Sequence, residues 1–387
     1  YIYMDPELTQ LLQAEYLKQT STINLIASEN FTNETVLSPL SSCLSNKYAE
    51  GEAGNRLYPG VEICDKIELL AIKNLKQLFK LTDDWIVNVQ PLSGAPANLE
   101  LLTALIEPGS TIMMLTHNHG GHMSHGDNGS LIKKIYNVIE YELQDNGLLN
   151  YENIETLIIN QKPKFLFAGY SLYPRDIDYK KFKQICQKNN VHFHVDIAHI
   201  AGLIAAGCLN SPFEFADSVT TTTHKTLRGP RGGIIFTKVN CHHGVFPGVQ
   251  AGPHMATIAS IAQMAFECQQ PQFIKYAKQT IINAQSAAKW LIQHGFNVQT
   301  NGTDTHMVVF ESDVKDVEYV LGRNGIYVNS CHMVNGNHGI RLGFACMSSF
   351  GIKEDGVVKI CELLEKALIG VDVTEEVKNF TKQYKIK

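Results

Sequence analysis

One lysine stands in a run of residues whose types suit covalent chemistry. The run from Val219 to Gly233 begins with β-branched residues typical of a strand and ends with three glycines and one proline, which predict a loop. Lys225 therefore lies where a strand gives way to a tight turn, with Arg228 and Arg231 nearby. Neighbouring cations and removal from water lower the pKa of a lysine and make its amine nucleophilic, as a Schiff base requires. The alternative is a loop lysine at the surface, because lysine is almost never fully buried.

An acid ends another predicted strand. Asp196 follows the run Val191–Val195 and would be a partly buried carboxylate, which needs a cation beside it or becomes protonated. A protonated pyridine nitrogen is one suitable partner. The other interpretation is the N-cap of a helix that starts at Ile197, and the spacing alone leaves both open.

A third pattern suits an anion. The residues Ser93 and Gly94 join the predicted strand Ile86–Val89 to the predicted helix Ala97–Ile106. Such a junction offers free backbone N–H groups and the positive end of a helix dipole to a phosphate, although most Ser-Gly turns before helices are only caps.

Four histidines lie close together between residues 117 and 126, at His117, His119, His122 and His125. Imidazoles are common zinc ligands, but no cysteine or carboxylate joins them and the intervening glycines leave the geometry undefined. We therefore predict no metal site here.

The elements that position these residues alternate between strands and helices from about residue 85 to 238, which indicates an α/β fold with a largely parallel sheet. Ligands of such sheets bind at the carboxyl ends of the strands. Further predicted strands are 111–115, 165–168, 218–222 and 233–236, and further predicted helices are 6–19, 179–187, 256–266, 274–294 and 355–368. After Pro253 the pattern changes to a smaller α+β domain with strands near 306–310 and 340–343. We predict an N-terminal arm (1–30), a large domain (31–270) and a small C-terminal domain (271–387).

The composition excludes several classes of protein. The formal charge of −5 lacks the basic excess of a nucleic-acid-binding protein, and no run of about 18 apolar residues could cross a membrane. The nine cysteines form no CxxC pairs, which favours a reducing compartment over a disulfide framework. The chain does not begin with Met, which suggests a trimmed N-terminus and leaves a cytoplasmic or a mitochondrial location open.

Several of these runs together resemble one enzyme family. The sequence Val219–Gly233 is similar to the cofactor-lysine signature of serine hydroxymethyltransferases, and Val195–His199 to their Val-Asp-x-Ala-His motif. The runs Asn24–Phe31 and Ser45–Gly51 are also similar to the family. The resemblance covers nearly the whole chain and implies the type I pyridoxal-phosphate fold. It implies interconversion of serine and glycine, with tetrahydrofolate as the one-carbon carrier.

The resemblance also implies roles for individual residues. Lys225 would carry pyridoxal 5'-phosphate as an internal aldimine, and Glu50 would handle a proton unless it is a solvated loop acid. The other residues implied in catalysis are His224, Thr222 and Arg231. Residues implied to contact the cofactor are Tyr48, Ser93, Gly94, Ala95, His122, Ser171, Asp196, Ala198, His199 and Gly252. Residues implied to contact serine, glycine or folate are Ser28, Tyr58, Gly121, Met123, His199 and Arg341.

Tyr48 and Gly252 would serve the site of a neighbouring subunit, which implies a homodimer or a dimer of dimers. The chain departs from the family mainly where folate should bind. The departures are Leu57, Pro59, Ala95, Ala251 and a short segment before Arg341. They motivate two alternatives: a folate-independent aldolase of β-hydroxy amino acids, and a catalytically impaired subunit that acts through binding.

Overall fold

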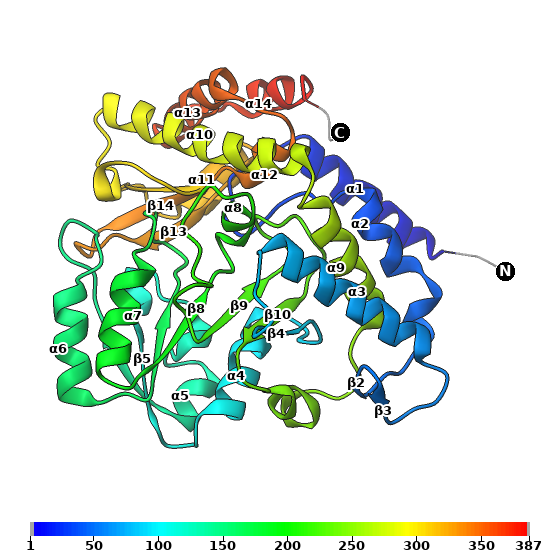
Figure 1. Cartoon of the computed structure of the whole chain (residues 1–387). Coiled ribbons are helices and arrows are strands. Elements are labelled where there is room, and N and C mark those ends of the chain that lie inside the picture. The colour runs from blue at the N-terminus through cyan, green and yellow to red at the C-terminus, as the bar shows by residue number, and fades with distance from the viewer. Residues whose placement is uncertain (1–3, 385–387) are drawn as a thin grey trace. The chain divides into compact units, whose positions relative to one another are not determined.

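The structure is a computed structural model that describes residues 4–384 (Figure 1). The chain divides into two compact units: residues 32–278 form the larger one, and residues 1–31 together with 279–387 form the smaller one. Residues 1–3 of the predicted arm lie outside the described residues. The division into an arm, a large domain and a small domain stays a prediction.

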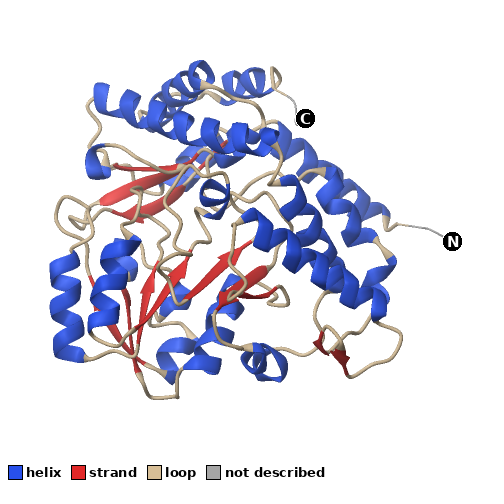
Figure 2. Ribbon diagram, in the orientation of Figure 1, coloured by secondary structure: helices blue, strands red, loops and turns tan. Residues whose placement is uncertain are grey.

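The larger unit is built on a seven-stranded sheet in the order β4-β10-β9-β8-β7-β5-β6 (Figure 2). Neighbouring strands from β9 to β6 are parallel, and only β10 runs antiparallel to its two neighbours. The predicted α/β fold with a mostly parallel sheet is therefore confirmed. The strands are β4 (Ile86–Asn88), β5 (Thr111–Leu115), β6 (Asn137–Tyr141), β7 (Phe165–Ala168), β8 (His192–Asp196), β9 (Ser218–Thr222) and β10 (Gly233–Thr237). Our sequence analysis did not predict β6, an edge strand with little burial.

Helices flank this sheet. They are α2 (Glu34–Leu37), α3 (Glu62–Leu78), α4 (Gly94–Leu105), α5 (Leu131–Ile135), α6 (Tyr151–Gln161), α7 (Tyr179–Lys188), α8 (Ala201–Ala205) and α9 (Met255–Glu267), with a two-stranded ribbon of β2 (Gly51–Glu52) and β3 (Asn55–Arg56). Helix α4 begins three residues earlier than predicted, because the extended Ser93 precedes it and Pro96 fits the first turn, where a missing N–H costs nothing. Buried Leu101 and Leu102 pack α4 against the sheet core.

The smaller unit contains a three-stranded antiparallel sheet in the order β11-β14-β13, and a parallel pair of β1 (Ile23–Asn24) with β12 (Ile326–Tyr327). The three strands are β11 (Met307–Glu311), β13 (Asn329–His332) and β14 (His338–Gly343). The helices are α1 (Pro6–Thr20), α11 (Val317–Arg323), α12 (Ala345–Ser349), α13 (Glu354–Leu368) and α14 (Thr374–Thr381), and the long α10 (Pro271–Gln293) spans both units.

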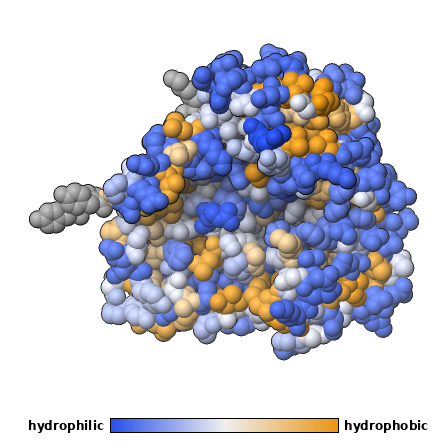
Figure 3. All heavy atoms as spheres, turned by 180° about the vertical axis from the view of Figure 1, so that it is seen from behind, coloured by the Kyte–Doolittle hydropathy of each residue, from blue (hydrophilic) through white to orange (hydrophobic). Residues whose placement is uncertain are grey.

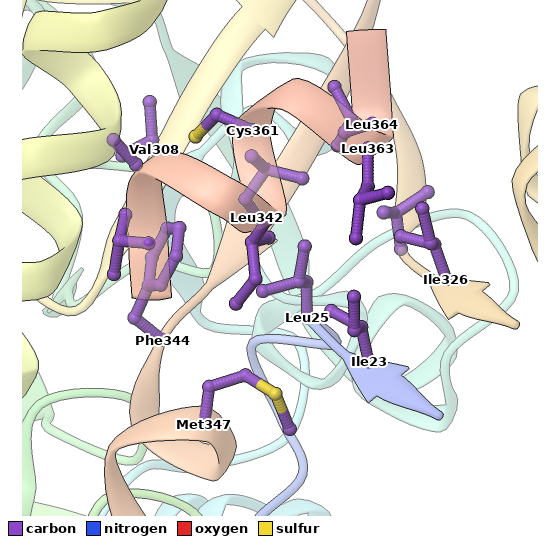
Figure 4. Packing of buried hydrophobic residues seen from close by; sticks show 14 of the residues in the cluster. Ile23, Leu25, Val308, Ile326, Leu342, Phe344, Met347, Cys361, Leu363 and Leu364 are labelled. Atoms are coloured by element: carbon purple, nitrogen blue, oxygen red, sulfur yellow. The ribbon is translucent and has the colours of Figure 1, made fainter. Parts of the chain in front are cut away.

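The core of the smaller unit joins segments from both ends of the chain. Ile23 and Leu25 of the N-terminal segment pack with Leu342 of β14 and with Leu363 and Leu364 of α13 (Figure 4). Burial of such side chains stabilises by about 1.5–3 kcal/mol each. This packing explains why the first 31 residues belong with the C-terminal segment.

The face drawn in Figure 3 carries mostly hydrophilic residues, with apolar patches among them. No helix among residues 4–384 is long and apolar enough to cross a membrane. All nine cysteines are free.

Candidate active site

The predicted site residues follow the carboxyl ends of one set of strands. Because β10 is antiparallel to both β4 and β9, β4 runs in the same direction as the parallel strands. The carboxyl ends of β4, β5, β7, β8 and β9 therefore meet at one edge of the sheet, where ligands of such folds bind. The residues at or just after these ends include Ser93, His122, Ser171, Asp196 and Lys225.

Asp196 is held as an anion by surrounding donors. Its Oδ2 accepts hydrogen bonds from His125 Nε2 at 2.9 Å and from Asn98 Nδ2 at 3.0 Å, and its Oδ1 accepts one from the Ala198 N–H at 2.9 Å. Burial alone would raise the pKa of Asp196, but these hydrogen bonds and the nearby imidazoles outweigh it and lower the pKa below its usual range. Helix α8 begins only at Ala201, so Asp196 is not its N-cap.

The four clustered histidines have separate partners. His117 bonds the Gly121 carbonyl, His119 accepts from the Leu143 N–H, His122 bonds Ser124, and His125 bonds Asp196. Among residues 4–384, no three His, Cys, Asp or Glu side chains are grouped so that they could hold a metal ion. Burial lowers the pKa of His122 to about 4, so its ring is neutral near pH 7.

The lysine loop leaves β9 as a tight turn that is fixed at both ends. Lys225 is only 7% exposed, which is unusual for a lysine. The Arg228 N–H donates to the Lys225 carbonyl at 3.1 Å. Thr226 donates through Oγ1 to the His199 carbonyl and accepts from the Gly202 N–H, both at 3.0 Å. The surface position considered from the sequence is therefore wrong.

His224, beside the lysine, is a neutral imidazole. Burial lowers its pKa to about 3, helped by the positive charges of Arg231 and Lys225. Its Nδ1 is buried and has no hydrogen-bond partner within residues 4–384. A buried polar atom without a partner costs free energy, so it needs an explanation such as a ligand or an ordered water. Arg231 itself is exposed.

The predicted phosphate loop is shaped by close backbone approach. A Cβ at Gly94 would lie 2.6 Å from Cγ2 of Thr222, so glycine is required where α4 begins beside the end of β9. The Ser93 side chain makes no capping hydrogen bond, and Ala95 is exposed. The N–H groups of Gly94 and Ala95, in the first turn of α4, have no acceptor within the helix and can bind an anion.

The loops after β5 and β7 are joined to each other. The Ser171 N–H donates to the Gly120 carbonyl at 2.7 Å. A Cβ at Gly121 would lie 1.9 Å from the Leu115 carbonyl oxygen, which only glycine permits. Met123, predicted to line the folate pocket, is exposed. The carbonyl of Ala198 lies 3.5 Å from the Thr222 hydroxyl.

A second cluster in the larger unit brings together four predicted residues. The rings of Tyr48 and Tyr58 meet edge to face with centroids 5.3 Å apart, and both are partly exposed. The Glu50 carboxylate raises the pKa of Tyr58 through its charge and a hydrogen bond. A Cβ at Gly252 would lie 3.1–3.3 Å from the Tyr48 ring. Tyr48 and Gly252, which were predicted to serve a partner subunit together, therefore lie side by side.

Arg56 contacts the backbone beside this second cluster, and no role for it was predicted from the sequence. Its buried guanidinium pairs with Asp65 at 2.8 Å and with Glu68, and it donates to the Ala49 carbonyl at 2.8 Å. Because the same guanidinium also donates to the Gly51 carbonyl, Arg56 holds the backbone on either side of Glu50.

In the smaller unit, the two residues predicted to bind a carboxylate lie on adjacent elements. Arg341 projects from β14, and its Nη2 donates to Oδ1 of Asn329 at 2.7 Å, across the strand pair. The segment before Ser28 lies against the end of the same strand, because the Gly343 N–H donates to the Leu25 carbonyl at 2.7 Å. A Cβ at Gly343 would lie 2.2 Å from Cα of Ala27.

Comparison with known proteins agrees with this geometry. Residues 2–364 match the family model described as Serine hydroxymethyltransferase. The chain belongs to the serine hydroxymethyltransferase family. It is 40% identical over 380 residues to "Serine hydroxymethyltransferase" of Desulfotalea psychrophila, covering 94% of this chain and 88% of the relative. It is 41% identical over 367 residues to "Serine hydroxymethyltransferase 2" of Pseudomonas putida, covering 90% of this chain and 87% of the relative.

Serine hydroxymethyltransferases use pyridoxal phosphate, and the residues at the sheet edge fit this group. Asp196 is an anion with one lone-pair direction of Oδ1 still open, which suits a pyridine N–H, because a carboxylate accepts about four hydrogen bonds. The first turn of α4 suits a phosphate, and the orphaned Nδ1 of His224 lies beside the buried Lys225. The donors His125, Asn98 and Ser124 were missed by the sequence analysis, because neither strand nor helix periodicity marks them.

Proposed function

We propose that this chain carries out the reaction for which its family is named. It would interconvert serine and glycine by moving a one-carbon unit to and from tetrahydrofolate. The observation that carries the proposal is that two groups occur at the same edge of the sheet. One is a buried lysine, Lys225, and the other is Asp196, a carboxylate that its neighbours keep ionised. Family membership alone would not establish activity, since residues at the site decide it.

Pyridoxal phosphate, when bound, supplies an electron sink for the bond that breaks at the substrate Cα. We propose that Lys225 is its covalent anchor and that Asp196 accepts the N–H of its ring. His122 would pack on the ring face, and Ser171, Ala198 and His199 would line the site. Ser93, Gly94 and Ala95 would bind the phosphate.

The residues beside Lys225 affect the charge around its amine. His224 is neutral, so it adds no positive charge next to the Lys225 amine and can accept or donate one hydrogen bond toward the site. Thr222 ends β9 against Gly94 and would fix the cofactor between β9 and α4. We propose that Arg231 steadies the loop electrostatically.

Substrate recognition is assigned to three groups. Arg341 offers a planar guanidinium, which suits bidentate binding of the amino-acid carboxylate, and Ser28 would add a hydroxyl donor. Tyr58 donates a hydrogen bond to the Glu50 carboxylate and would orient it, and Glu50 would take up and return a proton at its carboxyl oxygen during transfer. Gly121 and Met123 would contact folate.

We propose that the protein is a homodimer or a dimer of dimers. Tyr48 and Tyr58 are exposed and lie together beside the half-buried Gly252, and Leu57, next to Tyr58 in the sequence, is 66% exposed. Helix α1 contributes no buried residue and exposes Leu8, Leu11 and Leu12. Apolar surface of this kind marks protein contacts.

The test is incubation of the purified protein with L-serine and pyridoxal phosphate, with and without tetrahydrofolate. We expect glycine formation that depends on tetrahydrofolate. A Lys225→Ala variant should lose activity by more than about a thousandfold and should lose the borohydride-reducible chromophore. Cleavage that is indifferent to folate, or wild-type protein without a chromophore, would contradict the proposal.

A further inference from the structure

A chain of buried polar side chains runs behind Asp196. It starts at His192 on β8, whose Nε2 lies 2.8 Å from Ser218 Oγ on β9. It continues through His194, with Nδ1 2.9 Å from Ser218 Oγ and Nε2 3.0 Å from Thr220 Oγ1. Thr220 donates to Oδ1 of Asn98 on α4 at 2.6 Å. Asn98 donates through Nδ2 to Asp196, so the chain ends on the candidate cofactor acid.

The inner members of this chain are inaccessible to water. Ser218, His194 and Thr220 are fully buried and Asn98 nearly so, and the rings of Phe165 and Phe167 lie around His194 with centroids 5.3 and 5.0 Å away. Buried polar groups are costly unless every one is satisfied, and in a medium of low polarity hydrogen bonds strengthen each other along a chain. A satisfied network at this depth therefore fixes its members in one arrangement.

Because the ionised Asp196 needs a donor, the Asn98 amide nitrogen faces it, and this fixes the direction of every hydrogen bond in the chain. Thr220 uses its proton on the Asn98 carbonyl oxygen, so it must accept from His194 Nε2–H. Burial keeps His194 neutral, because it lowers the pKa well below the usual value, so Nδ1 carries no proton and accepts from Ser218. Ser218 then accepts from Nε2–H of His192, whose pKa burial lowers to about 4. Every proton in the chain points toward Asp196.

The two ends of the Asn98 amide have different partners. Nδ2 has two protons, one for Asp196 Oδ2 and one for Ser124 Oγ, both at 3.0 Å. Ser124 in turn donates to Nδ1 of His122 at 2.7 Å. The charge of Asp196 sets this orientation, because a flipped amide would place Oδ1 against the carboxylate, and the Thr220 hydroxyl completes it by donating to Oδ1.

We infer that His194, Ser218 and Thr220 are positioning residues that lock Asn98 as a donor and so hold Asp196 as an anion toward the cofactor ring nitrogen. This inference rests on the proposed function for the identity of the ligand. His192 and His194 act through Asn98 and do not touch the ligand. The His125 donor to Asp196 is independent of the chain, so loss of the chain should weaken the site without abolishing it.

Two adjacent threonines of β9 give a matched test. Thr220→Val removes the hydroxyl of the chain, whereas Thr221→Val removes an equally buried hydroxyl that donates to the Thr222 carbonyl and lies outside the chain. We measure the Kd of pyridoxal phosphate for the cofactor-free protein, and the ¹⁵N shift of the bound ring nitrogen with labelled cofactor. Thr220→Val should weaken binding roughly tenfold and move the shift toward the unprotonated form, while Thr221→Val should stay within about twofold.

A second pair tests the imidazole. His194→Phe keeps a planar ring but removes both hydrogen bonds, and His194→Gln can restore the donor to Thr220. We expect His194→Phe to weaken binding like Thr220→Val and His194→Gln to recover most of the loss. In cofactor-free protein with ¹⁵N-histidine, His194 should show a proton on Nε2 only, and Thr220→Val but not Thr221→Val should shift that signal.

Equal losses in the two threonine variants, an unchanged ring-nitrogen shift in Thr220→Val, or a His194 signal protonated on Nδ1 would overturn the inference. If His194→Phe does not fold, the comparison of Thr220→Val with Thr221→Val tests the inference by itself. Failure of wild-type protein to bind pyridoxal phosphate would instead refute the proposed function, and the tautomer measurement would still judge the chain.

Discussion

Glu100 carries a carboxyl group whose surroundings destabilise its charged form. It lies on α4, is 0% exposed, and neither of its oxygens has a hydrogen-bond partner among residues 4–384. The adjoining segment packs closely on it, since a Cβ at Gly244 would lie 2.1 Å from the Glu100 carbonyl oxygen. Burial raises the pKa of Glu100 from 4.5 to about 8. No function assigned above uses this group, so its replacement should report on stability.

The magnitude follows from linkage between protonation and folding. Below pH 4.5 Glu100 is protonated in both the folded and the unfolded protein, so its raised pKa does not lower the free energy of unfolding. As the pH rises from 4.5 to 8, the unfolded chain ionises first and stability falls. Each pH unit in this range costs about 1.4 kcal/mol, so the loss is about 3 kcal/mol at pH 7 and about 5 kcal/mol above pH 8. Replacing Glu100 with leucine should restore this free energy.

The assay is urea unfolding of wild-type, Glu100→Leu and Glu100→Gln proteins at pH 5.5, 7 and 8.5. Glu100→Leu should gain about 3 kcal/mol at pH 7, which corresponds to roughly 4 °C in the thermal midpoint for a chain of this length. Glu100→Gln should remove the pH dependence but gain less, because its buried amide stays unsatisfied. Parallel pH profiles for the wild type and Glu100→Gln would show that this carboxyl does not titrate as argued.

Three further predictions follow from contacts at the site. Gly121→Ala should destabilise the protein and weaken pyridoxal phosphate binding at least tenfold, because the new Cβ meets the Leu115 carbonyl; thermal melts and cofactor titration check this, and wild-type values for both would contradict it. Arg56→Gln should cost about 3–5 kcal/mol in urea unfolding, since it removes the cation that pairs with the buried Glu68 and the half-buried Asp65, and a change below 1 kcal/mol would argue against a buried ion pair. Mixing refolded Lys225→Ala and Tyr48→Ala subunits, each inactive alone, should restore about a quarter of wild-type activity if sites are shared between subunits, and none if they are not.

Much of the fold could be predicted because strand patterns and motifs agree locally. The predicted strands 111–115, 165–168 and 218–222 match β5, β7 and β9 residue for residue, since each is a short apolar or β-branched run ended by Gly, Ser or Thr. Strand β6 was missed, because its side chains are only half buried at the sheet edge and lack an apolar run. The grouping of residues 1–31 with the C-terminal unit was also missed, since it depends on long-range packing of Ile23 and Leu25.

The candidate site was predictable where a single residue stands at or just after the end of a predicted strand. Asp196 ends β8 and Lys225 follows the end of β9, and the fold brings these carboxyl ends to one edge, so this much follows from topology. Their supports could not be predicted, because Asn98 lies on α4 whereas Ser124 and His125 lie in the loop after β5, and the two segments meet only after folding. The departures at Leu57 and Pro59 lie in an exposed segment.

The polar chain behind Asp196 shows why strand periodicity alone is an incomplete guide to function. His192 and His194 alternate with apolar Phe193 and Val195, which in a strand normally marks one face as exposed to water. Here that face is buried, and Ser218 and Thr220 occupy matching positions on β9, because the register pairs His194 with Ser218 and Asp196 with Thr220. Two polar stripes on adjacent parallel strands satisfy each other inside the protein. Polar residues that alternate with apolar ones on neighbouring strands of a buried sheet therefore indicate an internal hydrogen-bond network. The residue at the strand end where this network stops, here Asp196, is the functional group that the network positions.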